Sequence, residues 1–349
     1  MRSLTPEYLD QISFASDHMS TLRTIGEYKG KQQLFSEQTP ETLENLQQAA
    51  MIESNECSNR LEGITAPHER IEALVLQSTK PKNRPEQEIA GYRDALNLIH
   101  ESSQYMDLSV NTVLQMHSML YRYLPGEGGR WKMMDNEIVE RNPDGSIKRV
   151  RFRAVSAVAT PQAMDDLVQN YGAAVHEFNK EPLVVVPLTI LDFLCIHPFK
   201  DGNGRVSRLM TLLLLYHYGY KVGRYISLER IFEESKETYY EALEASSQGW
   251  HDAKHNVVPW LGYFWGTLLR AYKEFEERVG TIRTGRGSKT EQVRLAVARR
   301  TVPFAISDIE ADCPGVSRDM IRLVLRQLRD EGAIVLQGKG RGAKWLKNI

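Results

Sequence analysis

The sequence is poor in cysteine. Its three cysteines, Cys57, Cys195 and Cys313, are odd in number and widely separated, without a CxxC pair. A disulfide framework or a zinc site needs several cysteines at closer, recurring spacings. We therefore expect packed free thiols and neither of those two kinds of stabilisation.

Long apolar runs are also missing. The run at residues 209–216 falls far short of the roughly 20 residues that a membrane span needs. The opening MRSLTPEYLDQIS lacks the apolar stretch of a signal peptide. With 42% hydrophobic and 26% charged residues, the 349-residue chain indicates two or three globular domains. We predict a cytoplasmic protein with no membrane partner.

The net charge of -1 conceals an uneven distribution of charge. Residues 281–349 carry 14 Lys and Arg against 7 Asp and Glu, whereas residues 1–280 carry 30 against 38. A surplus of positive charge at one end favours contact with polyanions there.

Residues 281–289 are polar, basic and rich in glycine, which predicts a linker. Before it, apolar residues recur at helical spacing, so we predict a mainly α fold. The expected helices lie at roughly 41–62, 86–103, 109–123, 161–178, 187–196, 204–219, 235–247 and 257–279. The exception is residues 136–155, where Asn142-Pro143-Asp144-Gly145 separates two strand-like runs and predicts a β-hairpin.

The stretch HPFKDGNGRVSR, residues 197–208, interrupts two apolar helical patterns. Pro187 is compatible with the first turn of the helix before it, and His197-Pro198 ends that helix. The next helix is expected to begin at Asn203 or Gly204. A short loop that leads into a helix presents backbone N–H groups to an anion.

The side chains of this loop favour a polyphosphate ligand. Gly202 and Gly204 allow a phosphate to approach the backbone closely. Arg205 and Arg208 are three residues apart, so both guanidinium groups can reach the same side of the helix N-terminus.

Two further side chains suit metal-assisted proton transfer. Asp201 supplies a hard oxygen ligand for Mg²⁺, and His197 can accept a proton near neutral pH. Taken singly, a histidine at a helix end is usually structural, and Phe199 reads as a core anchor. The full set of residue types at these spacings favours function.

At these residues the chain resembles the Fic (Fido) family, whose members usually transfer AMP from ATP to hydroxyl side chains of target proteins. The resemblance implies that His197 is the base, that Asp201 holds Mg²⁺, and that the hairpin is a flap that pairs with the target. It also implies a nucleotide site, with Phe199 locking the loop; the residues are Phe199, Gly202, Asn203, Gly204, Arg205 and Arg208.

A second motif, Ser58-x-x-x-Glu62-Gly63, ends the expected helix at 41–62. A glutamate in the last turn opposes the helix dipole by roughly 0.3 to 1 kcal/mol unless a cation is nearby. The plain interpretation is a solvated glutamate beside Arg60. The motif also resembles the inhibitory signature of the Fic family, which implies that Glu62 pairs with Arg208 and disfavours a productive ATP pose.

The nucleoside pocket is less well defined. By resemblance Tyr239, Tyr240 and Leu243 could shape it, although aromatic residues at helical spacing belong to a core more often than they contact a ligand. Some relatives place an asparagine where this chain has Ser246-Ser247, so the preferred base stays open.

The basic C-terminal region has its own pattern. Ser307 is expected to cap a short helix, Ser317 to cap the next and Gly332 to end it. Helix, turn, arginine-striped helix and basic hairpin resemble a winged helix-turn-helix domain, which reads DNA or serves as a protein-binding or dimerising module. The candidate DNA contacts are Arg318, Arg322, Arg326, Lys339 and Arg341.

We therefore predict an N-terminal helical region (1–100), a catalytic core (101–280), a linker (281–289) and a winged helix (290–349). The expected function is a protein adenylyltransferase that uses ATP and Mg²⁺ on Ser, Thr or Tyr of a target protein and is inhibited by Glu62. The alternatives are a DNA-binding regulator that senses nucleotide, and a Fic enzyme that transfers UMP or a phosphoryl group or removes AMP. A homodimer is expected from the resemblance alone.

Overall fold

The chain is described by a computed structural model, which covers residues 3–38, 40–77, 79–124, 126, 128–141, 144, 146–279, 288–298, 300, 303–313, 316–338 and 343–347. It divides into two compact units, Met1–Gly280 and Thr281–Ile349. Most of the expected linker, residues 281–287, lies outside the described residues. Residues 1–100 and the expected catalytic core belong to the same unit.

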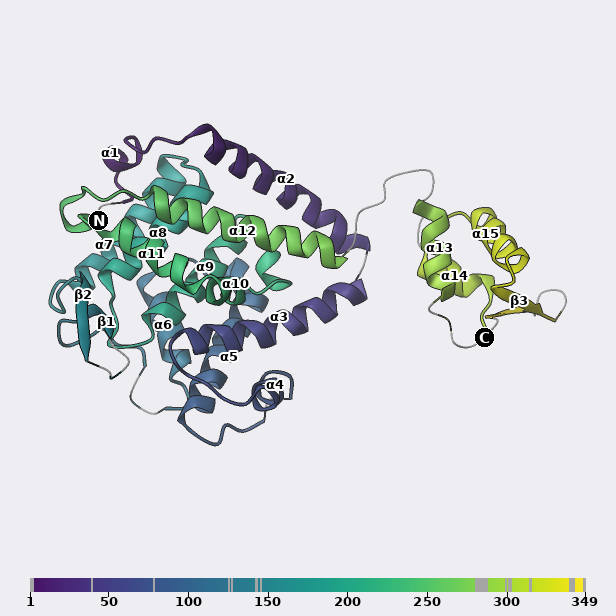
Figure 1. Cartoon of the computed structure of the whole chain (residues 1–349), viewed down its shortest axis with the longest axis horizontal. Helices are drawn as coiled ribbons and strands as arrows, with labels where there is room; N and C mark the ends of the chain where they lie inside the picture. The colour runs from purple at the N-terminus through teal and green to yellow at the C-terminus, as the bar shows by residue number, and fades with distance from the viewer. Residues whose placement is uncertain are drawn as a thin grey trace. The chain divides into compact units, whose positions relative to one another are not determined.

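The first unit is a bundle of helices (Figure 1). The prediction of a mainly α fold is confirmed. The α-helices are α1 (Pro6–Leu9), α2 (Ser16–Gln38), α3 (Pro40–Leu61), α4 (His68–Leu76), α5 (Arg84–Ser102), α6 (Val110–Leu120), α7 (Thr160–Gly172), α8 (Pro182–Ile196), α9 (Asn203–His217), α10 (Leu228–Glu234), α11 (Lys236–Ser247) and α12 (Val258–Val279). Shorter helical turns lie at Ser103–Tyr105, Ala173–Glu177, Val222–Arg224 and Trp250–Asp252.

Helices α8 and α9 form the centre of this unit, and both are almost entirely buried. Helix α8 begins at Pro182, so the predicted start at Pro187 is wrong. A proline inside a helix leaves the carbonyl four residues earlier without its usual donor. Here the Trp265 indole on α12 donates to that carbonyl, on Leu183, at 2.7 Å. A tertiary contact therefore replaces the missing backbone hydrogen bond.

The predicted hairpin consists of β1 (Glu137–Arg141) and β2 (Ile147–Arg153), which pair antiparallel with two irregularities in register. Asn142, Pro143 and Gly145 of its turn lie outside the described residues. Strand β2 is tied to α11, because Arg149 Nη1 lies 2.6 Å from Glu244 Oε1. The hairpin thus stands beside the helix that carries Tyr239 and Tyr240.

The second unit contains α13 (Ser288–Ala298), α14 (Ile306–Asp312), α15 (Arg318–Asp330), β3 (Ile334–Gln337) and β4 (Lys344–Lys347). The two strands pair antiparallel, and an apolar core joins the helices to them. Ser317 caps α15 as predicted, since its hydroxyl accepts from Met320 N. The predicted cap at Ser307 is wrong: α14 is capped at Ala305, whose N–H donates to the Asp308 carboxylate at 2.7 Å.

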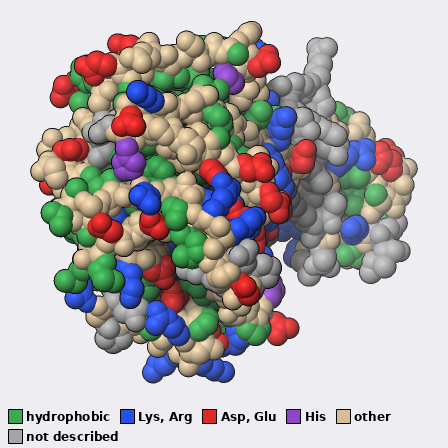
Figure 2. All heavy atoms as spheres, turned by 60° about the vertical axis from the view of Figure 1, so that its left-hand side comes forward, with side chains coloured by type: hydrophobic (Ala, Val, Ile, Leu, Met, Phe, Trp, Pro, Cys, Tyr) green, Lys and Arg blue, Asp and Glu red, His purple; other side chains and the backbone are tan. Residues whose placement is uncertain are grey.

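The surface of the first unit mixes both charges. On the face shown in Figure 2, acidic and basic side chains are interspersed over the helices. Within the described part of the chain, no helix combines the length and apolar character needed to cross a membrane.

Candidate functional site

The loop between α8 and α9 has a fixed, unusual backbone. His197 has φ 50° and ψ 60°, and Gly202 has φ 81°. The left-handed region is disfavoured for a residue with a Cβ, so His197 keeps this conformation only because its surroundings hold it. The Asn203 side chain closes the turn, accepting from Phe199 N at 2.9 Å and donating to Phe199 O at 2.8 Å.

Phe199 anchors this loop in the core. Its ring is fully buried and stacks on the His117 ring with centroids 3.7 Å apart. The Trp131 ring also packs against Phe199, with centroids 5.2 Å apart. The expected role of Phe199 as an anchor agrees with these contacts, which leave no face of the ring to a ligand.

His117 on α6 supports the loop, and sequence reasoning did not single it out. Its Nδ1 accepts from Gly129 N at 2.9 Å, which leaves Nε2 as the protonated nitrogen. That N–H donates to the Asp201 carbonyl at 3.1 Å. Burial lowers the pKa of His117 to about 4, so it stays neutral and props the loop. In the sequence it was only one histidine within an expected helix.

His197 has the hydrogen-bonding arrangement of a general base. Its Nδ1 lies 3.3 Å from the Leu194 carbonyl, so Nδ1 carries the proton and Nε2 keeps a lone pair. Burial lowers the pKa of His197 to about 4; Lys132 lowers it further, whereas the Leu194 carbonyl, Glu62 and Asp201 raise it. The imidazole is therefore neutral at pH 7 and can accept a proton.

Asp201 is exposed at the edge of the loop. Its Oδ1 accepts from Gly202 N at 2.6 Å, and the Tyr121 hydroxyl also interacts with the carboxylate. Among the described residues, no group of three or more His, Cys, Asp or Glu could hold a metal ion. A single carboxylate suits Mg²⁺ whose other ligands are phosphate oxygens and water, so the residues fit Mg²⁺ only together with a nucleotide.

Arg208 is bound by the motif that ends α3. Its Nη2 donates to Glu62 Oε1 and to Ser58 O, and its Nε donates to Ser58 Oγ, each at 2.8 Å. The Arg208 side chain is 2% exposed and that of Glu62 is 26% exposed. Gly63, with φ 77°, ends the helix in the left-handed region where glycine is favoured. Nε and Nη2 of Arg208 therefore both donate to groups within the chain.

The Glu62 carboxylate also covers the first turn of α9. A Cβ built on Gly204 would overlap Glu62 Oε1. This glycine is therefore needed for the approach of Glu62 in this structure, and the carboxylate lies where the helix N-terminus attracts an anion.

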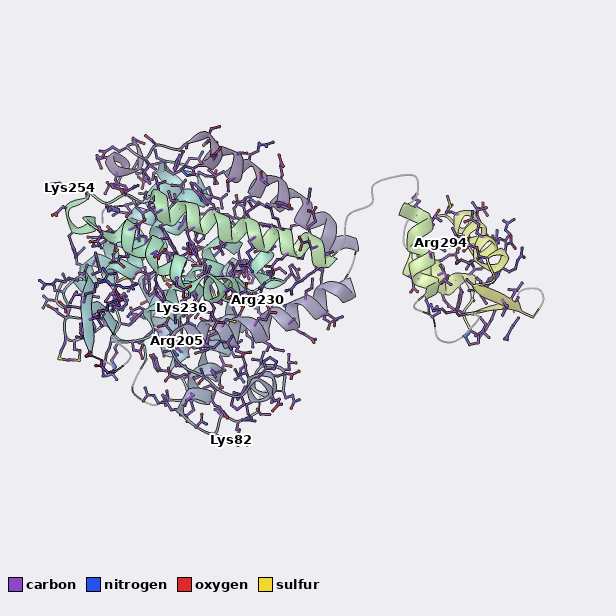
Figure 3. All side chains as sticks on the ribbon, viewed as in Figure 1. Lys82, Arg205, Arg230, Lys236, Lys254 and Arg294 are labelled. Carbon is purple, nitrogen blue, oxygen red and sulfur yellow. The ribbon has the colours of Figure 1, made fainter. Side chains whose placement is uncertain are left out.

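Arg205 and Arg208 do not bind the same carboxylate. Its Nη1 donates to Glu88 Oε2 on α5 at 2.7 Å, and its Nη2 donates to the Tyr121 hydroxyl at 3.0 Å. The side chains of Arg205 and Glu88 are 0% and 6% exposed. Figure 3 shows Arg205 among the helices of the first unit, whereas Lys82 and Lys254 lie at its edge. The two arginines therefore bind carboxylates from different helices.

The two tyrosines proposed for the nucleoside pocket differ in burial. Tyr239 is buried among aromatic rings, with Phe232, Tyr263 and Trp260 at 5.3, 5.7 and 5.9 Å. Tyr240 is half-buried, and burial and Glu62 raise its pKa while Arg208 and Arg151 lower it. Tyr240 therefore lies close to the candidate site, and Tyr239 belongs to the core beneath it.

The candidate DNA contacts lie in the second unit. Arg318, Arg322 and Arg326 are exposed on α15. Arg318 lies 3.4 Å from Glu310 and Arg322 lies 3.2 Å from Asp319, so nearby acids offset part of their charge. Lys339 and Arg341 lie outside the described residues.

Residues 107–215 match the model of the Fic/DOC family. The chain belongs to the Fic/DOC family. The matched range includes α6, the hairpin, α8, the loop and nearly all of α9.

Similar proteins carry the same family names. A protein adenylyltransferase Fic of Drosophila willistoni is 27% identical over 164 residues, which is 46% of this chain and 29% of that protein. A Fido domain-containing protein of Dictyostelium discoideum is 31% identical over 94 residues, covering 24% of this chain and 66% of that protein. The chain thus spans less than a third of the length of the Drosophila relative.

Solved Fic structures share the fold. A Fic family protein from Desulfovibrio desulfuricans G20 has a TM-score of 0.64 at 20% identity and covers 97% of each chain. Fic-1 from C. elegans has a TM-score of 0.58 at 17% identity and covers 75% of this chain and 72% of its own.

Proposed function

We propose that this chain is a protein adenylyltransferase that transfers AMP from ATP to a hydroxyl side chain of a target protein. The observation that carries the proposal is the state of His197. Its Nε2 keeps a lone pair at neutral pH, and it stands four residues before Asp201 in a loop that leads into a helix N-terminus. A base beside an anion-binding turn suits attack of an alcohol on a phosphorus atom.

In the proposed reaction, the hydroxyl oxygen of the target forms a bond to the α-phosphorus of ATP. His197 Nε2 takes the hydroxyl proton, and the bond from the α-phosphorus to the bridging oxygen breaks, so that pyrophosphate leaves. The N–H groups at Asn203 and Gly204 would stabilise phosphate charge at the start of α9. Asp201 would hold Mg²⁺, which neutralises phosphate charge when bound. The hairpin would align the target chain.

Glu62 would inhibit this reaction. It occupies the space over Gly204 and engages Arg208, so a γ-phosphate would have to displace a carboxylate to reach either. Like charges disfavour a carboxylate and a phosphate at the same helix end.

Replacement of Glu62 by glycine tests the activity and its inhibition together. Glu62→Gly should raise incorporation of α-labelled ATP into the protein itself or into lysate proteins by at least about tenfold, which corresponds to about 1.4 kcal/mol. Mass spectrometry should find one added adenylate on the labelled protein.

The double variant Glu62→Gly, His197→Ala is the matched control and should incorporate no label. Equal labelling by Glu62→Gly and the parent chain would refute inhibition by Glu62. No adenylate transfer by Glu62→Gly to any of several targets would refute the adenylyltransferase.

A DNA-binding regulator is the second candidate, favoured by the exposed arginines of α15. The unit resembles a winged helix in its order of helices and hairpin. His197→Ala should abolish AMP transfer and leave DNA binding unchanged, since the two proposals use different units.

A further inference from the structure

Lys132 lies in the segment between α6 and β1 and contacts the chain on both sides of His197. Its Nζ donates to the carbonyl of Ile196 at 3.1 Å, and its backbone N–H donates to the carbonyl of Pro198 at 2.9 Å. Its side chain also donates to Asn136 Oδ1 at 2.8 Å. The residues before and after His197 are therefore both bound by one lysine.

We propose that Lys132 is a positioning residue that holds His197 in the conformation required of the base. The inference rests on the proposed function of this site. A histidine in the left-handed region is strained and persists only where neighbouring contacts over-determine that conformation. Lys132 supplies two of those contacts, and Asn136 Nδ2 supplies a third by donating to the Phe199 carbonyl at 3.0 Å.

The charge of Lys132 acts on His197 as well. Lys132 is only 5% exposed, and burial lowers its pKa to about 8 while Asp135 raises it. It is therefore cationic over the range in which His197 titrates. A cation beside the imidazole disfavours imidazolium, against the opposing effects of the Leu194 carbonyl, Glu62 and Asp201. Lys132 thus extends the range in which the base is unprotonated to lower pH.

The Lys132→Met variant separates these effects, because methionine keeps the apolar stem and the N–H bond to Pro198 and removes the ammonium group. In the Glu62→Gly background, kcat for adenylate transfer should fall by about tenfold to a hundredfold, as for a small misplacement of a catalytic group. KM for ATP should change by less than about twofold, because Lys132 would touch neither the nucleotide nor Arg208. The acid limb of the pH profile should move upward by about one pH unit.

Two companion variants distinguish positioning from general loss of structure. Lys132→Arg retains the charge and should keep the acid limb of the parent, with part of the rate restored. Lys254→Met removes an exposed lysine of the same unit and should match the parent in every measurement. If Lys132→Met has the kcat and acid limb of Lys254→Met, the proposal is overturned.

An NMR titration of His197 in the full chain tests the role of Lys132 without an enzyme assay. The pKa of the His197 imidazole should rise by about one unit in Lys132→Met and stay unchanged in Lys254→Met. If Glu62→Gly transfers no adenylate, the proposed function fails while this titration still tests Lys132. An unchanged His197 pKa in a folded Lys132→Met protein would overturn the role of Lys132.

Discussion

The two units of the chain use charge differently. The first unit buries arginines that pair with carboxylates: Arg205 pairs with the buried Glu88, and the buried Arg208 pairs with the partly exposed Glu62. In the second unit, the described residues of the core are apolar apart from Cys313, and its arginines lie on the surface. All 9 histidines of the chain lie in the first unit. A helical fold does not require ion pairs in its interior. In the first unit, both of these pairs involve an arginine of the candidate site.

Breaking a buried ion pair should have the largest effect on stability. Glu88→Ala leaves the Arg205 guanidinium buried beside Tyr121 without its carboxylate. Loss of one partner of a buried pair destabilises by about 3 to 5 kcal/mol. The free energy of unfolding of the first unit, measured in urea, should fall by that amount.

Its control breaks an exposed pair of the second unit. Arg294 Nη1 donates to Glu331 Oε2 at 2.8 Å, with side chains 32% and 49% exposed. Glu331→Ala should leave the unfolding midpoint of the second unit almost unchanged, because water screens exposed pairs. Equal losses in the two variants would contradict the contrast between the units.

Acid should weaken the first unit more than the second. Burial lowers the pKa of His100 to about 3 and those of His117 and His197 to about 4. An unfolded histidine titrates near about 6.5, so between these values the unfolded chain binds more protons and the folded state loses stability as pH falls. A pKa lowered to about 4 corresponds to at most about 3 kcal/mol for each group.

Asp192 acts in the opposite direction, since burial raises its pKa to about 6. Its folded form keeps a proton that the unfolded chain releases, so its contribution stabilises the fold as pH falls toward about 4. Three histidines outweigh this one carboxyl. Hydrogen exchange of the full chain should show opening of the first unit between pH 6.5 and 4, with the histidine-free second unit protected over the same range. An equal loss of protection in the two units would show that the buried histidines of the first unit are not the cause of its sensitivity to acid.

The smallest stability effect is expected on α15. Arg326 is exposed, and its Nε donates to the Arg322 carbonyl at 3.3 Å. If this face binds duplex DNA, Arg326→Ala should leave the unfolding midpoint unchanged and weaken DNA affinity by about 1 to 3 kcal/mol. Fluorescence anisotropy across salt concentrations checks both affinity and phosphate contacts. If the parent chain does not bind DNA at low salt, the second unit is not a DNA-binding module, and the protein-binding alternative is favoured.

Local patterns predicted much of this fold. The apolar spacing of α8 and α9 indicated both helices, and the motif between them located the loop at 197–208. Helix α2 was missed because it has few apolar residues with helical spacing; it is held by packing on α12. The start of α8 was misplaced because Pro187 looked like a helix start, and only the distant Trp265 makes an internal proline acceptable.

The side-chain partners could not be predicted from spacing. Glu88 and Arg205 are 117 positions apart, and Lys132 reaches Ile196 across 64 positions. Arg205 and Arg208 are adjacent on a helix surface, yet their carboxylates come from α5 and from the end of α3. Local geometry limits where a guanidinium can point, and tertiary packing selects the partner.

The indole of Trp265 links the completion of α8 to the arrival of α12. Until residue 265 has been synthesised and docked, the carbonyl of Leu183 lacks the donor that it has in the finished protein. Helix α8 carries His197 at its C-terminal end. During synthesis from the N-terminus, the contact that completes α8 therefore forms only after most of the first unit has emerged.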